Sequence, residues 1–338
     1  MSRVISRRVA LRAATLLVVC LVSWPTAGTA LATSTTFSGQ ATGVRATVLG
    51  NTTVLSDTGR LPSAGGSQEA ALLSANAAGV GAQVLHATTI GQGDRSRSEA
   101  SVASLSVTAG TNSVSATFLM ARAIAMCGSG GASASGDSEI ADLVINGQQI
   151  AVSGQPNQTV PLPGGGTVII NEQSSGRQGD ITVDALHVNV PGVADVVVAS
   201  AHADITCPPP GQLTCNGGDF VTGGGWITTP SSARGTFAVA GGIKNGGYWG
   251  HLEYIDHGTG MKVKGTGVTA YTVGQTVNTR HIEGTAEIDG TPGTYKVDVA
   301  DNGGPGVGVD TFSIILPSGY TASGYLGGGN IQLHMPCH

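Results

Sequence analysis

Apolar and polar residues alternate along much of this chain with the period of two that is typical of a half-buried β-strand. Residues 103–108 place apolar side chains at odd positions and hydroxyl side chains at even positions, and the alternation resumes at 113–118 after a Gly-Thr-Asn sequence. Because successive side chains on a strand point to opposite faces, the pattern predicts a hairpin with one apolar and one hydroxyl face.

Other segments give the same kind of signal. Asn146-Gly147 separates two short apolar runs, and this pair supplies the two positive-φ residues of a two-residue hairpin turn. Apolar runs at 168–170, 181–190 and 196–198 predict three more strands. The Ala- and Leu-rich run 68–85 fits either strands or one short helix, which its glycines would interrupt. We therefore predict an all-β chain with less than about a tenth of its residues in helices.

Composition divides the chain near residue 212. Between residues 33 and 206 the aromatic residues are Phe37 and Phe118 and there is no lysine, whereas eleven aromatic residues and all four lysines follow residue 215. The sequence Cys-Pro-Pro-Pro-Gly starts at Cys207, and proline cannot donate to a sheet ladder. We predict two β-sandwich-like domains, 33–207 and 215–338, joined by a short Pro-rich connector at 208–214.

The second of these domains has a glycine triplet near each end. Residues 223–225 and 327–329 are glycines beside short apolar segments, and a cysteine lies outside each triplet. Glycine permits close backbone approach, so we expect the first and last strands of this domain to lie together.

The first 32 residues have the layout of a cleavable export signal. Four arginines precede an apolar run at 13–22, and Ala30-Leu31-Ala32 supplies a small-residue cleavage pattern. About ten apolar residues fall short of the roughly 20 that span a bilayer, so we expect cleavage after Ala32 and no transmembrane anchor in the mature chain. Residues 6–11 approach the twin-arginine export pattern, with Ala10 in place of its usual Phe, and this leaves the export route open.

Charge and composition exclude two classes of protein. The chain has 16 Lys+Arg and 21 Asp+Glu; the signal holds four of the arginines and no acid, so the mature chain carries 12 − 21 = −9. It has no basic stripe of the kind that contacts a phosphate backbone, which argues against nucleic-acid binding. A hydrophobic fraction of 40% argues against disorder, although charged residues make up only 11%.

Four cysteines remain after removal of the signal, and four cysteines permit three pairings. We predict Cys127–Cys207 and Cys215–Cys337, because each bond then lies within one domain. The second bond closes a loop of over 100 residues, for which chain entropy gives about 4 to 5 kcal/mol of stabilisation. The alternative is a zinc site formed by Cys207, Cys215, Cys337 and His338. The gap between the first two is wider than usual for zinc, and an oxidising exterior favours disulfides.

A polar sequence, His-Leu-Glu-Tyr-Ile-Asp-His, starts at His251. On a strand His251, Glu253 and His257 share one face, and two imidazoles with a carboxylate suit a transition metal. A hydrolase would pair Glu253 with Asp256 or Glu283 as acid and base. No Gly-x-Ser-x-Gly nucleophile motif accompanies the cluster, and we prefer the interpretation of a half-exposed strand with polar side chains outward.

Oxygen ligands are concentrated in a second segment, where Asp298, Asp301, Asn302 and Asp310 surround a glycine-rich sequence. Carboxylate and amide oxygens are the ligands that calcium prefers, although the spacing is not that of an EF-hand. The alternative is a plain turn in which Asp301 or Asn302 caps its own backbone. We expect no other cofactor, and calcium at this loop is the ion that we retain as a hypothesis.

The aromatic residues of the second domain offer a binding surface. Tyr248, Trp249 and Tyr254 lie close together in the sequence, and aromatic faces supply broad contact area with a polar handle. The alternative is that most of the eleven aromatic residues form the core of the module. An envelope glycan or a surface protein is the expected partner.

Several segments also resemble a known family. Residues 41–46 (ATGVRA), 54–59 (VLSDTG), 90–100 (IGQGDRSRSEA) and 142–148 (DLVINGQ) are similar to the choice-of-anchor P family, over roughly residues 35–207. Residues 245–257 and Asp301-Asn302-Gly303 resemble the module that follows this domain in some members. The family consists of exported bacterial proteins, mostly from actinobacteria, and the resemblance implies no known catalytic site. The sequence after the second module has no sortase-type motif or terminal apolar span, so we expect a released or non-covalently retained protein.

These observations give two functional hypotheses. The leading one is an exported cell-surface or extracellular structural or adhesive protein, without catalysis, whose C-terminal module binds a glycan or another envelope component. The alternative is a secreted hydrolase that uses the carboxylates and histidines near residues 251–257. A hydrolase requires Glu253 and its partner to converge in a cleft, whereas a binding module exposes aromatic rings.

Overall fold

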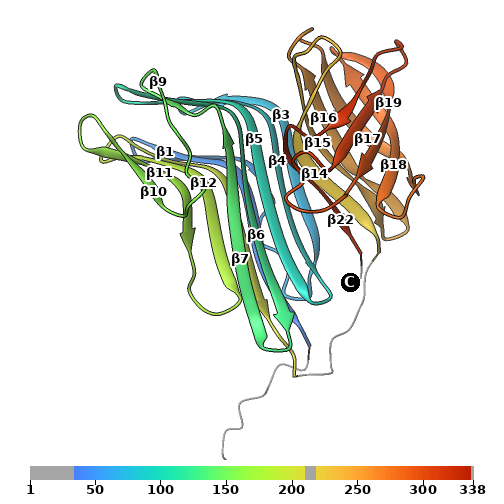
Figure 1. The fold of residues 1–338 in the computed structure, drawn as a ribbon, viewed down its shortest axis with the longest axis horizontal. Helices are drawn as coiled ribbons and strands as arrows, with labels where there is room; N and C mark the ends of the chain where they lie inside the picture. The colour runs from blue at the N-terminus through green and yellow to red at the C-terminus, as the bar shows by residue number, and fades with distance from the viewer. Residues whose placement is uncertain (1–33, 210–217, 336–338) are drawn as a thin grey trace, which may run out of the picture. The chain divides into compact units, whose positions relative to one another are not determined.

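The computed structural model describes residues 34–209 and 218–335, and its regular structure consists of the 22 strands β1–β22 in three antiparallel sheets (Figure 1). No helix occurs in the described residues, so the all-β prediction is confirmed. The same residues accordingly contain no helix long and apolar enough to cross a membrane. The predicted signal at 1–32 lies outside the described residues.

The first half of the chain forms two of the sheets. Sheet A places the first and last strands of this half, β1 and β13, side by side in its interior. In sheet order its strands are β10 (Gln158–Leu162), β11 (Gly166–Ser174), β12 (Asp180–Val190), β13 (Ala194–Thr206), β1 (Thr36–Val48) and β2 (Asn51–Asp57).

Sheet B follows the sequence from one hairpin to the next. Its order is β3 (Gly66–Ala77), β4 (Val80–Gln92), β5 (Arg95–Ala109), β6 (Asn112–Gly128), β8 (Val144–Ile145) and β9 (Gln148–Gln149), with β7 (Gly131–Ala141) also paired to β6. Sheets A and B pack face to face (Figure 1), and Leu85, Leu119, Ile170 and Ile205 lie in their shared core. This half is therefore a β-sandwich.

The hairpins of sheet B follow from the alternation in the sequence. Apolar residues of β5 and β6 are buried while the intervening Ser and Thr residues from 104 to 117 are exposed, as predicted. Asn146 and Gly147 have φ of 50° and 79°, which confirms the predicted turn. The run 68–85 forms the β3–β4 hairpin and not a helix, because Ala78 and Gly79 adopt positive φ and turn the chain back.

The second half forms sheet C, which curls around its own core (Figure 1). Rings of Phe237 and Phe312 stack there with centroids 3.9 Å apart. The strands, in sheet order, are β21 (Thr321–Tyr325), β20 (Thr311–Ile315), β19 (Thr291–Ala300), β18 (Thr279–Ile288), β17 (Lys262–Val273), β16 (Gly247–Asp256), β15 (Arg234–Lys244), β14 (Phe220–Thr228) and β22 (Gly328–His334).

The glycine triplets lie where the first and last strands of this half pair with each other, β14 with β22. The expectation that the first and last strands lie together is confirmed. A Cβ atom at Gly225 would lie 2.4 Å from the carbonyl oxygen of Gly328, so the close approach requires glycine. Leu326 and Gly327 carry the chain from the β21 edge into β22, and the Gly327 amide donates to the Trp226 carbonyl at 2.9 Å.

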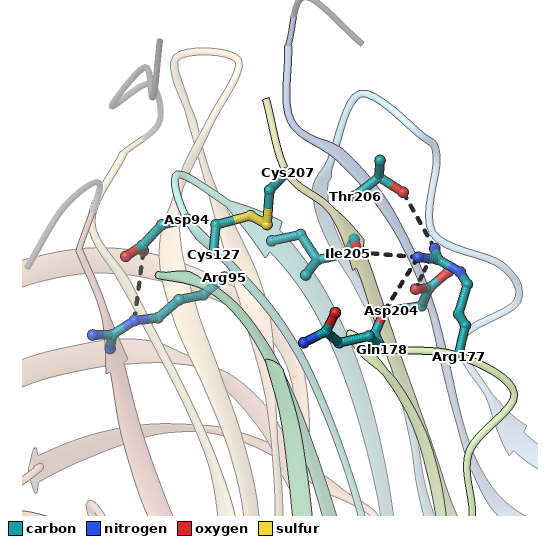
Figure 2. The surroundings of a disulfide bond; sticks show 9 residues. All are labelled: Asp94, Arg95, Cys127, Arg177, Gln178, Asp204, Ile205, Thr206 and Cys207. Carbon is teal, nitrogen blue, oxygen red and sulfur yellow. Dashed lines mark hydrogen bonds and ion pairs between the residues drawn. A yellow bond between two sulfur atoms is a disulfide. The ribbon is translucent and has the colours of Figure 1, made fainter. Parts of the chain in front are cut away.

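A disulfide bond joins Cys127, near the end of β6, to Cys207, just after β13 (Figure 2). The bond links sheet B to sheet A and confirms one predicted pair, and it takes Cys207 out of the alternative zinc set. Beside it, the Arg177 guanidinium pairs with Asp204 at 2.6 Å and donates to the Thr206 hydroxyl at 3.2 Å (Figure 2). The predicted partners Cys215 and Cys337, with His338, lie outside the described residues.

The two halves meet along sheet B and sheet C. Val84, Phe118 and Met120 of sheet B pack with Ala238 and Ile255 of sheet C in a small apolar cluster. Sheets A and B come from residues before the predicted connector, and sheet C comes from residues after it. Part of the connector, 210–214, lies outside the described residues.

Candidate ligand-binding site

Tyr254, one of the three aromatic residues predicted to bind a ligand, belongs to the core. It is fully buried, its ring packs near Phe312, and its hydroxyl hydrogen-bonds to the Tyr320 hydroxyl at 2.7 Å. Burial raises the pKa of Tyr254 to about 12. The prediction of a ligand contact here is corrected, because Tyr254 shares the inner face of β16 with Leu252.

The other two predicted aromatic residues lie at the start of β16. The turn before them is formed by Asn245 and Gly246, whose φ values are 51° and 77°. Tyr248 is 51% exposed, whereas Trp249 is partly buried and lines a cleft of about 490 Å³. The two residues, which the sequence predicts as one binding surface, therefore differ in the structure: Trp249 lines the cleft and Tyr248 does not.

The cleft lies where the two halves meet. Its aromatic lining consists of Phe37 from the first half and Phe220 and Trp249 from the second. The ring centroids of Phe220 and Trp249 are 5.5 Å apart with the rings tilted by 54°. Phe37 and Phe220 are more than nine-tenths buried, so Trp249 offers the most accessible ring. We call this feature the aromatic cleft.

Glycines make room for these rings. A Cβ atom at Gly91 would lie 2.5 Å from Cγ of Phe37, and one at Gly242 would lie 3.1 Å from the Trp249 indole nitrogen. Substitution at either position would push a ring out of place, because real Cβ contacts are longer. The glycine content of these strands is thus part of how the aromatic cleft is shaped.

Polar groups at the aromatic cleft are few. The ammonium group of Lys244 lies 5.9 Å from the Trp249 ring centroid and donates to the Ser67 carbonyl at 3.0 Å. The Gln92 amide donates to the Gly218 carbonyl at 3.2 Å. Among the described lining residues Lys244 is the single charged residue, and there is no carboxylate or histidine. The aromatic cleft therefore suits binding through ring faces and donors and lacks an acid–base pair.

His251 and Glu253 share the outer face of β16, as the alternation predicts, but they face buried groups. His251 Nδ1 lies 3.1 Å from a Glu69 carboxylate oxygen, and its Nε2 lies 3.2 Å from His86 Nδ1. Burial raises the pKa of Glu253 to about 7. His257 lies beyond the end of β16 and hydrogen-bonds to the Thr236 hydroxyl at 2.9 Å.

The carboxylates that the hydrolase hypothesis pairs are not assembled. Asp256 is on the opposite face of β16 from Glu253 and accepts hydrogen bonds from the Gly258 amide at 2.8 Å and the Tyr320 hydroxyl at 2.9 Å. Glu283 is held on the exposed side of β18 by Lys296 at 2.8 Å. None of the three faces another across a cleft in the described structure.

The predicted calcium loop is brought together only in part. Asp301 and Asp310 both turn toward β22: one accepts from the Leu333 amide at 2.8 Å and the other from the Ile331 amide at 2.9 Å. Burial raises the pKa of Asp310 to about 6. These carboxylates are hydrogen-bond acceptors that fasten the loop to β22.

The other two residues of that set act differently. Asn302 donates from its side chain to the Val309 carbonyl at 2.6 Å, within the loop. Asp298 lies apart on β19, where it accepts from His281 Nδ1 at 2.7 Å. Among the described residues no group of three or more His, Cys, Asp or Glu side chains is placed to hold a metal ion.

The sequence did not identify Phe37, Phe220, Lys244 and Gln92 as site residues. Phe37 is one of two aromatic residues in the first half of the chain. This rarity is the strongest indication in the sequence that any of these four residues belongs to a binding site. The aromatic cleft brings together segments of the two halves that are more than 120 residues apart in the sequence, and no local pattern indicates that contact. No family model, curated protein or solved structure matches this chain.

Proposed function

We propose that this chain is an exported structural or adhesive protein of the bacterial cell surface or extracellular space, and that its aromatic cleft binds an envelope glycan. The observation that carries the proposal is the grouping of Phe37, Phe220, Trp249 and Lys244 around about 490 Å³. Ligand sites commonly enclose 300–1,000 Å³ with mainly apolar walls and a few polar groups.

Sugar rings match this chemistry. Their apolar C–H faces stack on aromatic rings, while their hydroxyl groups, and the carboxylates of acidic sugars, accept from an ammonium group or an amide. The Trp249 ring and the Lys244 ammonium group lie within reach of one ligand, because their separation is 5.9 Å. The lining has no acid–base pair, and this supports binding without hydrolysis.

Two further observations support export. The first 32 residues have the charge and hydropathy layout of a cleavable signal. The Cys127–Cys207 bond is of the kind that persists in oxidising compartments outside the cytosol.

The test is binding of the mature protein to an array of neutral and acidic cell-envelope oligosaccharides, followed by calorimetry on the best ligand. Trp249→Ala should weaken that binding at least about tenfold, because truncating a central Trp commonly costs about 2 kcal/mol or more. Tyr248→Ala is the matched control: it removes a neighbouring aromatic residue outside the cleft lining and should leave the affinity unchanged. Equal affinity of wild type and Trp249→Ala would contradict the proposal.

A further inference from the structure

A second hollow of about 510 Å³ lies on the outer face of sheet C, over strands β18–β21. It shares no lining residue with the aromatic cleft and is built from the second half alone. We call it the β18–β21 groove.

The groove follows from the register of four strands. Two rows of directly paired residues cross this face from β18 to β21. The first row is His281, Asp298, Ser313 and Ser323; the second is Thr279, Ala300, Thr311 and Tyr325. Alternation places the core residues of these strands, such as Val299 and Phe312, on the opposite face.

Side chains of different size along the second row shape the groove. Ala300 has a small, nearly buried side chain in the middle of the second row. At the end of that row Tyr325 is 66% exposed on the outermost strand. The small side chain of Ala300 therefore leaves space in the middle of the groove, Tyr325 borders it with an accessible ring, and Thr and Ser residues complete the lining.

Charge narrows the choice of ligand. Asp298 is the charged residue among the described groove residues, and His281 donates to it from the neighbouring strand. A carboxylate without a cation in the lining disfavours phosphates, sulfates and acidic sugars. The hydroxyl groups and the carboxylate suit the hydroxyl groups of an uncharged ligand, and the tyrosine ring suits its C–H face.

We propose that the β18–β21 groove is a second binding site that takes a neutral saccharide. Tyr325 stacks on one sugar ring, Asp298 accepts from sugar hydroxyl groups, and Ser313 and Ser323 exchange hydrogen bonds with the same ligand. This site does not depend on the aromatic cleft, whose Lys244 also accommodates acidic sugars. A protein with both sites would bind two glycan segments at once.

The experiment uses the mature protein, the same array of neutral and acidic oligosaccharides, and calorimetry on the best neutral ligand. Tyr325→Ala should lower the affinity for that ligand by about tenfold, which corresponds to about 1.4 kcal/mol for the loss of a stacked ring. Tyr325 is exposed at a sheet edge, so its removal leaves the core intact. Ile315→Ala, another exposed side chain on the outer face of β20, is the matched control and should bind normally.

Two further variants separate the two sites. Trp249→Ala should retain the Tyr325-dependent binding of the neutral ligand. Asp298→Asn should keep the groove shape and raise the affinity for acidic sugars relative to wild type. The proposal is overturned if no neutral saccharide binds, or if every neutral ligand is lost in Trp249→Ala and retained in Tyr325→Ala. The second of these results would leave the proposed function of the aromatic cleft intact.

Discussion

At the scale of single residues, burial decides which aromatic side chains can meet a ligand. Trp249 and Tyr254 are five positions apart in one strand, and the sequence predicts both as ligand contacts. They lie on opposite faces of β16, so one borders a cleft while the other is enclosed by sheet C. The parity of a position along a strand thus separates a binding residue from a core residue.

Tyr254→Phe tests this assignment. The change removes one hydroxyl group from a buried hydrogen-bonded chain that continues through Tyr320 to Asp256. It should lower the free energy of unfolding by about 1 kcal/mol, the usual value of a buried hydrogen bond, and leave glycan affinity unchanged. Denaturant unfolding and calorimetry measure the two effects. Lower affinity with unchanged stability would return Tyr254 to the list of ligand contacts.

At the scale of elements, turn chemistry and alternation predict much of the fold. The hairpin across 103–118 and the Asn146-Gly147 turn follow from the sequence because each depends on neighbouring residues. The run 68–85 stayed ambiguous because alanine suits helices and small core positions alike. In the structure this run forms two strands, because Ala78 and Gly79 adopt positive φ and make a turn between them.

The β18–β21 groove could not be predicted in the same way. Its two rows exist only once four strands are paired in one register, and register depends on the packing of the whole sheet. The sequence did single out Asp298, although as a calcium ligand in a loop. The structure places this residue in a strand with a histidine beside it.

The 301–310 loop is an element whose carboxylates have a structural use. Asp301 accepts from the Leu333 amide and from the Gln332 side chain, so it joins the loop to β22. Asp301→Ala should lower the unfolding free energy by about 1.5–3 kcal/mol, because these hydrogen bonds involve a charged acceptor. The loss should appear in chelator-treated protein, as measured by denaturant unfolding. A loss seen only with millimolar calcium present would instead support the calcium site.

At the scale of the whole molecule, ionisable side chains of sheet B take part in the contact between the halves. The Asn330 amide donates to Glu99 at 3.2 Å, the Gly329 amide donates to Glu139 at 3.1 Å, and Arg122 donates to the Pro305 carbonyl at 2.9 Å. Each contact joins sheet B to the second half. The stability of this contact must therefore depend on pH.

Glu99 gives the clearest case. Burial raises its pKa from 4.5 to about 7, against the opposing effects of Arg122 and the Asn330 hydrogen bond. A raised pKa means that the folded protein binds the proton more tightly than the unfolded chain. Stability from this group is fully present below about pH 4.5 and is lost as the pH rises toward 7, by roughly 3 kcal/mol in total. Buried His86 has the opposite effect on stability: burial holds its pKa well below the usual value, so the protein loses stability as the pH falls below 6.5.

A difference between variants isolates the glutamate from the histidines. Glu99→Gln keeps the size and hydrogen-bonding oxygen of the side chain but cannot ionise, so its stability relative to wild type should increase between pH 5 and pH 8. With pKa values of 4.5 in the unfolded chain and about 7 in the folded protein, the increase over this pH range is roughly 2.5 kcal/mol. Asp142→Asn is the control: hydrogen bonds from Thr117 and Arg234 lower the pKa of this exposed carboxyl group, so the stability difference between this variant and wild type should be flat over the same range. Denaturant unfolding at several pH values measures both differences. A flat difference for Glu99→Gln would mean that Glu99 titrates normally and that water reaches the contact between the halves.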